Sequence, residues 1–242
     1  MVSHKKIKEV LQSWGLENEK LTDVVYAETG NVSESACYVG DNYIIKFSPN
    51  LGNVEKHISL SQAIESVGLS AATPIKTVEG KFVVASEELY FYVTKRLEGK
   101  QLMASTMYFE DYMPKARFIG EIVGQLSVAL SKVDVITNQA NIFKSAKEWA
   151  IPALVGKVDM PKSFVEMYEK EFGEIYESLP QQIIHRDQNP GNIILCGDNW
   201  GVLDFDLSER NIRIFDPCYA ATAILSESFE ADNTDKLNQW IM

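Results

Sequence analysis

The first part of the chain alternates between helix-like and strand-like patterns of apolar side chains. Apolar residues recur three and four positions apart over residues 5–14, which predicts an amphipathic helix that ends at Gly15. A second pattern of this kind covers residues 53–67 and ends before Pro74, because proline cannot continue a helix. We therefore expect two helices in this part.

Short segments rich in valine, isoleucine, tyrosine and phenylalanine separate and follow these helices. Residues 23–47 contain three such segments with turn-forming residues between them. Residues 81–97 contain two more, joined by a short turn, which is typical of a hairpin. Together they predict a five-stranded antiparallel sheet that carries one helix.

The pattern becomes mainly helical from residue 101 to residue 180. Helical periodicity is clear in segments such as FIGEIVGQLSVALSKV and SFVEMYEKEFGEIYESL. Three prolines divide this region, namely Pro114, Pro152 and Pro161. We expect a second part of the molecule built largely from helices.

Composition and charge narrow the possible functions. The chain has 242 residues, of which 45% are hydrophobic, and its 23 basic and 34 acidic side chains give a net charge of -11. That apolar fraction is sufficient for a core and excludes a disordered protein. The negative charge makes nucleic acids and anionic membrane surfaces poor partners, and cationic or metal-bound ligands better ones.

Cysteine usage and the absence of long apolar runs indicate a cytoplasmic protein. Cys37, Cys196 and Cys218 are too few and too scattered for a disulfide framework or a four-ligand zinc site, so reduced thiols are expected. The sequence has neither a signal peptide nor an apolar run of about 18 residues, so no membrane association is expected. It does not indicate an oligomeric state.

Residues 181–206 carry the chemistry that the sequence makes most visible. Their closely spaced polar groups are His185-Arg186-Asp187, Asn192 and Asp204-Phe205-Asp206. Phosphoryl transfer needs a carboxylate that orients an acceptor hydroxyl, for which Asp187 is suited, and divalent cations that neutralise charge between phosphates. Mg²⁺ prefers hard oxygen ligands, which Asn192 and Asp204 supply. A hairpin between these two residues would bring them together.

These motifs resemble those of the aminoglycoside phosphotransferase and choline kinase group of small-molecule kinases. The spacing of HRDQNPGN and DFD carries the resemblance, which spans about residue 20 to residue 225. It implies an α+β, protein-kinase-like, two-lobed fold. Residues 1–97 would form the N-terminal nucleotide-binding lobe, and residues 98–242 the helical lobe for catalysis and substrate, shortened at its end.

The same resemblance assigns residues to the nucleotide, ATP or GTP. Lys46 would hold its α- and β-phosphates, and a turn that includes Ser33 would cover them, although this turn has a single glycine. The segment after the last strand would be the hinge between lobes. There the carbonyl of Lys95 and the amide of Leu97 would bind the edge of the base.

The carboxylate that pairs with Lys46 is harder to assign. His57 stands where the family usually has glutamate, and Glu55 lies two positions away, on a different side of the helix. Glu55 is the preferred partner and Glu65 a second candidate. His57 is expected to be a surface residue or a weak substitute.

The remaining motif residues have supporting roles in this interpretation. Asp206 either reaches a second Mg²⁺ through water or is a solvated acid, and it is counted with Asn192 and Asp204 as a metal ligand. The resemblance gives His185 and Asp216 structural roles in bracing the catalytic loop. Arg186 departs from the family, where glycine is common.

A small acceptor is favoured over a protein, because the nine residues LSERNIRIF leave no room for an activation segment between Asp206 and Asp216. The expected function is transfer of a γ-phosphoryl group to a hydroxyl of a small molecule, and a cationic acceptor is compatible with the acidic chain. An aminoglycoside-like antibiotic or an amino-alcohol is preferred, and a metabolite of the choline or homoserine type is an alternative. A nucleotide-binding module without transfer activity is the rival interpretation. LSESFEADNTDKLNQWIM at the C-terminus is compatible with a final helix, a truncation or a docking segment.

Overall fold

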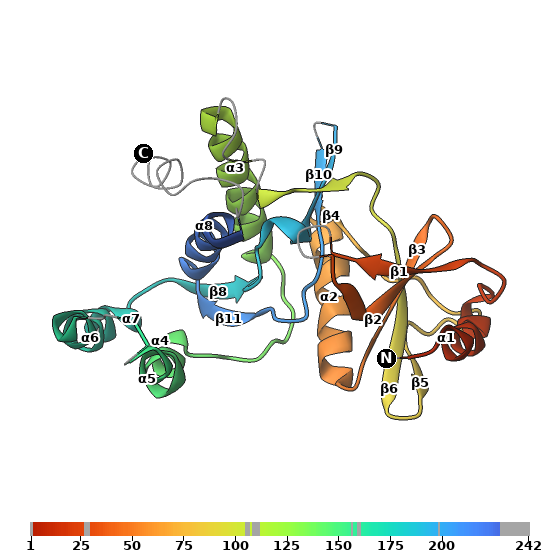
Figure 1. The fold of residues 1–242 in the computed structure, drawn as a ribbon, viewed down its shortest axis with the longest axis horizontal. Helices are drawn as coiled ribbons and strands as arrows, with labels where there is room; N and C mark the ends of the chain where they lie inside the picture. The colour runs from red at the N-terminus through yellow and green to blue at the C-terminus, as the bar shows by residue number, and fades with distance from the viewer. Residues whose placement is uncertain are drawn as a thin grey trace.

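The computed structural model describes most of the chain, and it consists of residues 2–26, 30–104, 107, 112–155, 157–158, 161–197 and 199–227. In Figure 1, the sheet and α1 lie on one side of the molecule, and most of the other helices lie on the opposite side. Helix α2 lies between these two parts. Helix α8 (Phe215–Glu227) includes the first residues of the C-terminal segment LSESFEADNTDKLNQWIM, and the rest of that segment, residues 228–242, lies outside the described residues.

A five-stranded antiparallel sheet forms the N-terminal part, as the strand patterns predicted. Its order is β1-β2-β3-β6-β5. The strands are β1 (Leu21–Val25), β2 (Val32–Val39), β3 (Tyr43–Ser48), β5 (Val84–Ser86) and β6 (Leu89–Lys95). Pairing of β3 with β6 places Lys46 opposite Tyr92, so the central strand fixes the position of this lysine.

The first helix closes one face of this sheet. Helix α1 (His4–Leu11) continues into the short helix η1 (Gln12–Trp14), and Gly15 ends it in a left-handed conformation with φ 69°. A left-handed residue after a helix favours glycine, which has no Cβ to clash. The apolar side of the helix packs on buried residues of β2, β3 and β6 and forms the core of this part.

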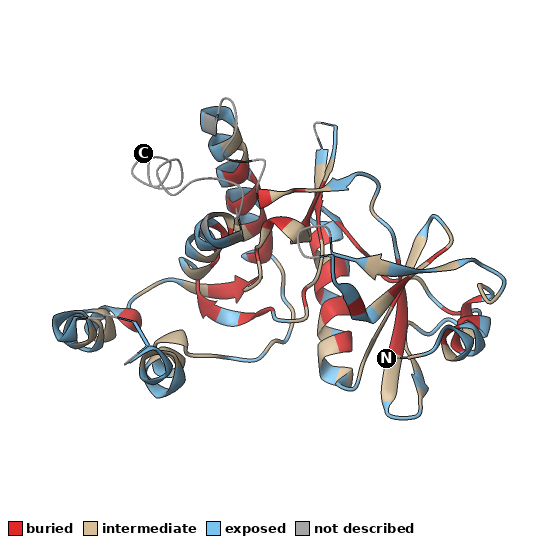
Figure 2. Cartoon of the chain, in the orientation of Figure 1, coloured by how far each residue is buried: buried red, intermediate tan, exposed pale blue. Residues whose placement is uncertain are grey.

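Helix α2 (Leu51–Ser66) connects the two parts of the molecule. Near its start, Val54 and Ile58 pack with Tyr92 of the sheet. Near its end, Leu60 and Ile64 pack in a core that also includes helix α3 (Tyr112–Leu130) and Phe205. Figure 2 shows this continuous buried side of α2. The helix is therefore held by both neighbours.

Two small sheets carry the polar motifs. One has the order β4-β10-β9-β7, and its strands are β4 (Ser70–Ala71), β7 (Lys100–Gln101), β9 (Ile193–Cys196) and β10 (Asn199–Val202). The other pairs β8 (Gln181–Ile184) with β11 (Glu209–Ile212). The hairpin of β9 and β10 was predicted. The two-residue strands β4 and β7 were not. Since β4 pairs with β10, this sheet spans the predicted border at residue 97.

Helices make up most of the remaining part, which establishes the α+β class. Helix α3 packs against α8 (Phe215–Glu227). Shorter segments follow α3, and they are α4 (Ile142–Ser145), η3 (Ala146–Ala150), α5 (Ile151–Leu154), α6 (Lys162–Met167), η4 (Tyr168–Phe172) and α7 (Gly173–Tyr176). No helix in the described part of the chain has the length and apolarity needed to cross a membrane.

Candidate active site

The predicted catalytic loop runs from the end of β8 through the short helix η5 (Pro190–Asn192) to β9. Arg186 adopts φ 70°, a left-handed conformation that is uncommon outside glycine and often occurs at functional sites. Glycine would adopt this conformation without the strain that a Cβ brings. The guanidinium of Arg186 compensates by donating to the buried Glu209 at 2.9 Å.

Asp216, at the start of α8, holds the beginning of this loop. Its two carboxylate oxygens accept the amides of His185 and Arg186, each at 2.8 Å. Burial raises the pKa of Asp216, opposed by the attraction of His185 and by these hydrogen bonds. The contacts place Asp216 where a bracing role requires it.

Replacement of Asp216 by asparagine is expected to destabilise the loop. An amide side chain has one acceptor oxygen, so one of the two buried amides loses its partner, at a cost of about 1–3 kcal/mol. Thermal unfolding should show a melting temperature lower by several degrees, at roughly 2–4 °C per kcal/mol for a chain of this size. The exposed Asp134→Asn variant is the control, and equal melting temperatures for both would refute the bracing role.

His185 is fully buried and makes a hydrogen bond with each ring nitrogen. Nε2 lies 2.8 Å from the carbonyl of Leu203, and Nδ1 accepts the amide of Asp187 at 3.3 Å. Because the carbonyl can only accept and the amide can only donate, Nε2 is the donor and Nδ1 the acceptor in these two contacts. His185 thus ties the loop to the strand-end that precedes Asp204.

The carboxylate of Asp187 is oriented by three side chains. Nδ2 of Asn189 donates to Oδ1 at 2.9 Å, and Nδ2 of Asn192 donates to Oδ2 at 3.0 Å and to the Asp187 carbonyl at 2.9 Å. The hydroxyl of Tyr219 on α8 donates to Oδ1 at 2.8 Å. Asn189 and Tyr219 were missed by the sequence interpretation. A carboxylate held this way is fixed in direction and remains an acceptor for a substrate hydroxyl.

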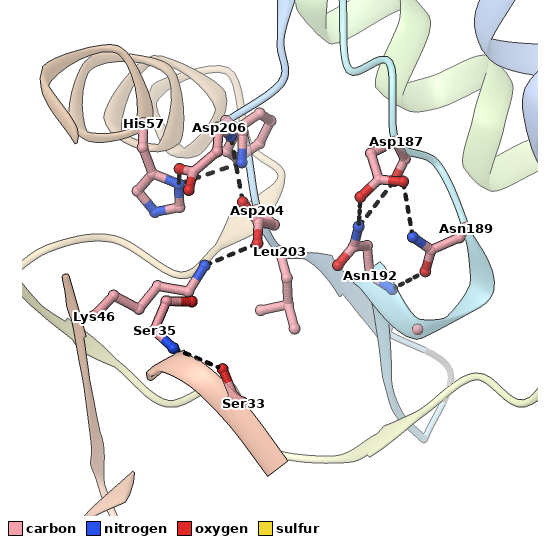
Figure 3. A network of polar contacts seen from close by, with 12 residues as sticks. Ser33, Ser35, Lys46, His57, Asp187, Asn189, Asn192, Leu203, Asp204 and Asp206 are labelled. Carbon is pink, nitrogen blue, oxygen red and sulfur yellow. Dashed lines mark hydrogen bonds and ion pairs between the residues drawn. The ribbon is translucent and has the colours of Figure 1, made fainter. Parts of the chain in front are cut away.

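Lys46 and Asp204 form an ion pair in the middle of the site (Figure 3), with Nζ 3.0 Å from Oδ2. Burial alone would lower the pKa of Lys46, but Tyr92 and the carboxylates of Asp204 and Asp206 raise it above its ordinary value. Burial alone would likewise raise the pKa of Asp204, but Lys46 and then His57 hold it well below its usual range. Both groups are therefore charged at neutral pH.

The predicted pairing of Lys46 with Glu55 is wrong in this structure. Glu55 is exposed on α2, and the carboxylate at Lys46 is that of Asp204. Glu65, the second candidate, instead accepts a hydrogen bond from Thr73 at 3.2 Å. Glu55 lies off the buried side of α2, which explains why it does not reach the lysine.

The expectation that His57 is a surface residue or a weak substitute for a glutamate is also corrected. His57 is 1% exposed, and its ring lies 5.2 Å from that of Tyr92. Nδ1 accepts the amide of Phe205 at 3.2 Å and lies 3.3 Å from Oδ1 of Asp206. Histidine thus occupies the position facing the Asp204–Asp206 turn.

Asp204 is the central one of the three predicted metal ligands, with Asn192 and Asp206 on either side. Asp204 has φ 59°, and its Oδ1 accepts the amide of Asp206 at 3.3 Å. Oδ1 of Asp206 is buried and has no hydrogen-bond partner among the described residues. Figure 3 shows Asn192 beside Asp187, on the other side of Asp204 from Asp206. An unpaired carboxylate oxygen next to further oxygen donors fits a hard cation such as Mg²⁺.

The predicted phosphate turn is only partly described. Ser33 lies on β2 and is 6% exposed, and its hydroxyl accepts from the amide of Ser35 at 3.4 Å and from Tyr26 at 3.3 Å. The turn is predicted over residues 29–33, and its first residue, Thr29, lies outside the described residues. The role of Ser33 with nucleotide phosphates stays a prediction.

The predicted hinge directly follows β6. The amide of Lys95 donates to Thr73 at 3.1 Å and the amide of Arg96 to Asn42 at 2.8 Å, which fixes the segment. The amide of Leu97 has no backbone partner in the described part of the chain, and its side chain reaches Gly201 of β10. Binding of a base by Lys95 and Leu97 stays a prediction, although this amide is available for it.

Comparison with solved structures identifies the fold. A complex of amicoumacin kinase hAmiN with AMP-PNP, Ca²⁺ and Ami has a TM-score of 0.67 at 12% identity, with 100% of this chain and 76% of that chain covered. The GDP and kanamycin complex of APH(2")-IIia has a TM-score of 0.68 at 14% identity, with 99% and 86% covered. A choline/ethanolamine kinase family protein from Mesorhizobium loti has a TM-score of 0.59 at 13% identity, with 96% and 72% covered.

Sequence comparison supplies the family. No curated protein sequence matches the chain significantly. The pattern of the phosphotransferase enzyme family (APH), however, matches residues 29–239, which include the catalytic loop and the Asp204–Asp206 turn. The predicted resemblance to small-molecule kinases is thus confirmed, and this chain belongs to the phosphotransferase enzyme family.

Proposed function

We propose that this protein transfers the γ-phosphoryl group of ATP or GTP to a hydroxyl group of a small molecule, in a reaction that needs Mg²⁺. The observation that carries the proposal is the oriented carboxylate of Asp187 in the same site as the Lys46–Asp204 ion pair (Figure 3). Phosphoryl transfer depends on positioning and charge neutralisation, and these groups supply both.

Asp187 would accept the hydrogen bond of the acceptor hydroxyl and take its proton as the new bond to phosphorus forms. The bond from the γ-phosphorus to the β–γ bridging oxygen breaks at the same time, and the nucleoside diphosphate leaves with that oxygen. The contacts of Asp187 with Asn189, Asn192 and Tyr219 keep the carboxylate in one direction before the acceptor arrives. This preorganisation lowers the cost of aligning the hydroxyl with the phosphate.

Lys46 would bind the phosphates of the nucleotide, since it already faces a carboxylate in a half-buried position. Asn192, Asp204 and Asp206 would hold Mg²⁺, which neutralises charge on the phosphates when bound. The nucleotide base would lie at Lys95 and Leu97. Solved relatives contain either an adenine or a guanine nucleotide, AMP-PNP in one and GDP in another, so both ATP and GTP are candidates.

The acceptor is proposed to be an aminoglycoside-like antibiotic or an amino-alcohol. The similar structures include complexes with kanamycin and with spectinomycin, and a choline/ethanolamine kinase family protein. The net charge of -11 favours a cationic acceptor of this kind.

The test is a panel assay of nucleotide consumption. ATP and GTP should each be tried with aminoglycosides, macrolides, choline and homoserine, with phosphorylated product identified by mass. Stimulation by one acceptor class, with equimolar product, supports the proposal. If nucleotide binds but no acceptor is phosphorylated, the rival interpretation of a binding module without transfer activity is favoured.

A specific expectation concerns Tyr219, which donates to the proposed base at 2.8 Å. Tyr219→Phe removes this hydrogen bond and keeps the ring, which stacks on Phe215 at 5.7 Å. We expect kcat to fall about tenfold with little change in KM for the nucleotide, because one orienting charge-assisted bond is lost. Comparison with Tyr219→Ala separates the effect of losing the ring from the effect of losing the hydroxyl. A Tyr219→Phe variant with wild-type kcat would exclude an orienting role.

A further inference from the structure

His57, Asp204 and Asp206 form a compact cluster on the α2 side of the site. One potential ligand atom from each residue lies within 4.8 Å of the others. Figure 3 shows His57 directed from α2 toward Asp206, while Asn192 lies beyond Asp204 with Asp187. The cluster thus combines an imidazole nitrogen with two carboxylates, a donor set that the oxygen-only prediction of Asn192, Asp204 and Asp206 did not include.

Hydrogen bonding in this cluster is incomplete. Oδ1 of Asp206 and Nε2 of His57 are both buried without a hydrogen-bond partner in the described ranges. Nδ1 of His57 accepts the amide of Phe205 with its one lone pair and lies 3.3 Å from Oδ1 of Asp206, so two acceptor atoms face each other. Buried unpaired groups of this kind are costly and often mark a functional role or the place of an ion.

The contacts of His57 within the chain leave this mismatch in place. While Nδ1 of His57 accepts the Phe205 amide, it has no hydrogen to offer to Oδ1 of Asp206, 3.3 Å away. A cation between the nitrogen and the carboxylates satisfies both acceptors. Lys46 pairs directly with Asp204 at 3.0 Å, whereas Asp206 faces Nδ1 of His57 at 3.3 Å.

We propose that His57, Asp206 and Asp204 bind a divalent first-row transition ion in the nucleotide-free protein. Imidazole nitrogen with carboxylate oxygen suits Mn²⁺, Fe²⁺, Co²⁺ or Zn²⁺, whereas Mg²⁺ prefers oxygen ligands alone. The ion has to compete with the 3.2 Å hydrogen bond from Phe205 to Nδ1. This site uses Asp204 and Asp206 in common with the proposed magnesium site, but it does not depend on phosphoryl transfer.

Such an ion would connect α2 directly with the Asp204–Asp206 turn. In the family this helix usually reaches the site through a glutamate and the lysine, as the resemblance implies, but here Glu55 is exposed and His57 faces the turn. Metal identity would therefore affect how firmly α2 is coupled to the turn.

The experiment uses the full-length protein with MnCl₂ and no nucleotide. Electron paramagnetic resonance gives the Mn²⁺ dissociation constant, and electron spin echo modulation detects a ¹⁴N nucleus bound to the ion. We expect one bound Mn²⁺ with imidazole ¹⁴N modulation, displaced by Co²⁺ at lower concentration than by Mg²⁺.

His57→Asn is the main variant, because its amide oxygen can still accept the Phe205 amide while the imidazole ligand is removed. It should lose the ¹⁴N modulation and bind Mn²⁺ about tenfold or more weakly, a loss typical of weakened metal coordination. His4→Ala is the matched control. It disrupts the cluster of His4, Asp23 and Cys37, the other group of potential ligands found among the described residues.

Each outcome decides the proposal. Modulation lost in His57→Asn and kept in His4→Ala supports it. Absence of ¹⁴N modulation in the wild type, or its loss only in His4→Ala, overturns it. If His57→Asn fails to fold, Asp206→Asn replaces it and should weaken Mn²⁺ binding by a similar factor, while unchanged binding refutes the site. Failure of the acceptor panel would leave these results unaffected, so the two proposals fail separately.

Discussion

Replacing Asp187 with asparagine is expected to lower the rate of phosphoryl transfer by about 10²–10⁴-fold, the usual contribution of a positioned acid or base. The amide cannot take the proton of the acceptor hydroxyl, although it has nearly the same size as the carboxylate. Affinity for the nucleotide should change little, since Asp187 contacts Asn189, Asn192 and Tyr219 and not Lys46. Steady-state kinetics and nucleotide titration measure the two effects separately.

The control for this experiment is Asp134→Asn, the same substitution at an exposed position. It should keep both the rate and the affinity of the wild type. Asp187→Ala gives a second comparison, in which the donors of Asn189 and Asn192 lose their acceptor altogether. If Asp187→Asn retained wild-type turnover with the acceptor identified by the panel, Asp187 would not be the base.

Asp204→Asn is expected to remove most of the benefit that Mg²⁺ gives to nucleotide binding. Asp204 is the central ligand of the proposed site and the ion-pair partner of Lys46, so its charge serves both the metal and the lysine. Affinity for the nucleotide in Mg²⁺ should fall about 100-fold, the upper end of the losses seen when metal coordination is disturbed. Without Mg²⁺ the affinity should change much less.

Calorimetric titration with and without Mg²⁺ separates this effect from a general loss of the pocket. Lys46→Met is the matched variant, because it removes the other member of the ion pair. It should weaken nucleotide binding under both conditions, since its role is contact with phosphates. If Mg²⁺ increased the nucleotide affinity of Asp204→Asn as much as it increases that of the wild type, a metal role for Asp204 would be contradicted.

Most of the sheet was predictable, because its strands carry local signals. Strong β-forming residues with turns between them located all five strands, and their order follows from hairpins and one crossover. Strands β4 and β7 have two residues each, which is too short for any periodic pattern. Their existence depends on pairing with the distant hairpin of β9 and β10, which no local pattern reveals.

The residues of the site likewise fall into two groups: those that a local motif predicts, and those that reach the site from a distant part of the chain. Asp187, Asn192 and Asp204 were found because they lie within one segment of fixed spacing. Tyr219 was missed because it reaches Asp187 from 32 positions along the chain. Tyr219 lies one turn after the start of α8. The sequence indicates that it is near the site only once the position of Asp216 is known.

The helical periodicity of the sequence already indicates that His57 is buried, but the partner of Lys46 was chosen for its charge instead. His57 lies three positions after Val54 and seven before Ile64, on the buried side of α2. Helical periodicity therefore places it in the interior and Glu55 outside. The choice of Glu55 followed the need of Lys46 for an acid, which Asp204 satisfies from 158 positions away.

Helix α2 packs against both parts of the molecule, and this has a consequence for folding. Leu60, Ile64 and Ala71 belong to a core completed by α3 and Phe205. A fragment that ended at residue 97 would leave this apolar side uncovered and would be prone to aggregation. The unit that unfolds cooperatively therefore crosses the predicted border at residue 97. Newly synthesised chains would complete it only after β9 and β10 have emerged.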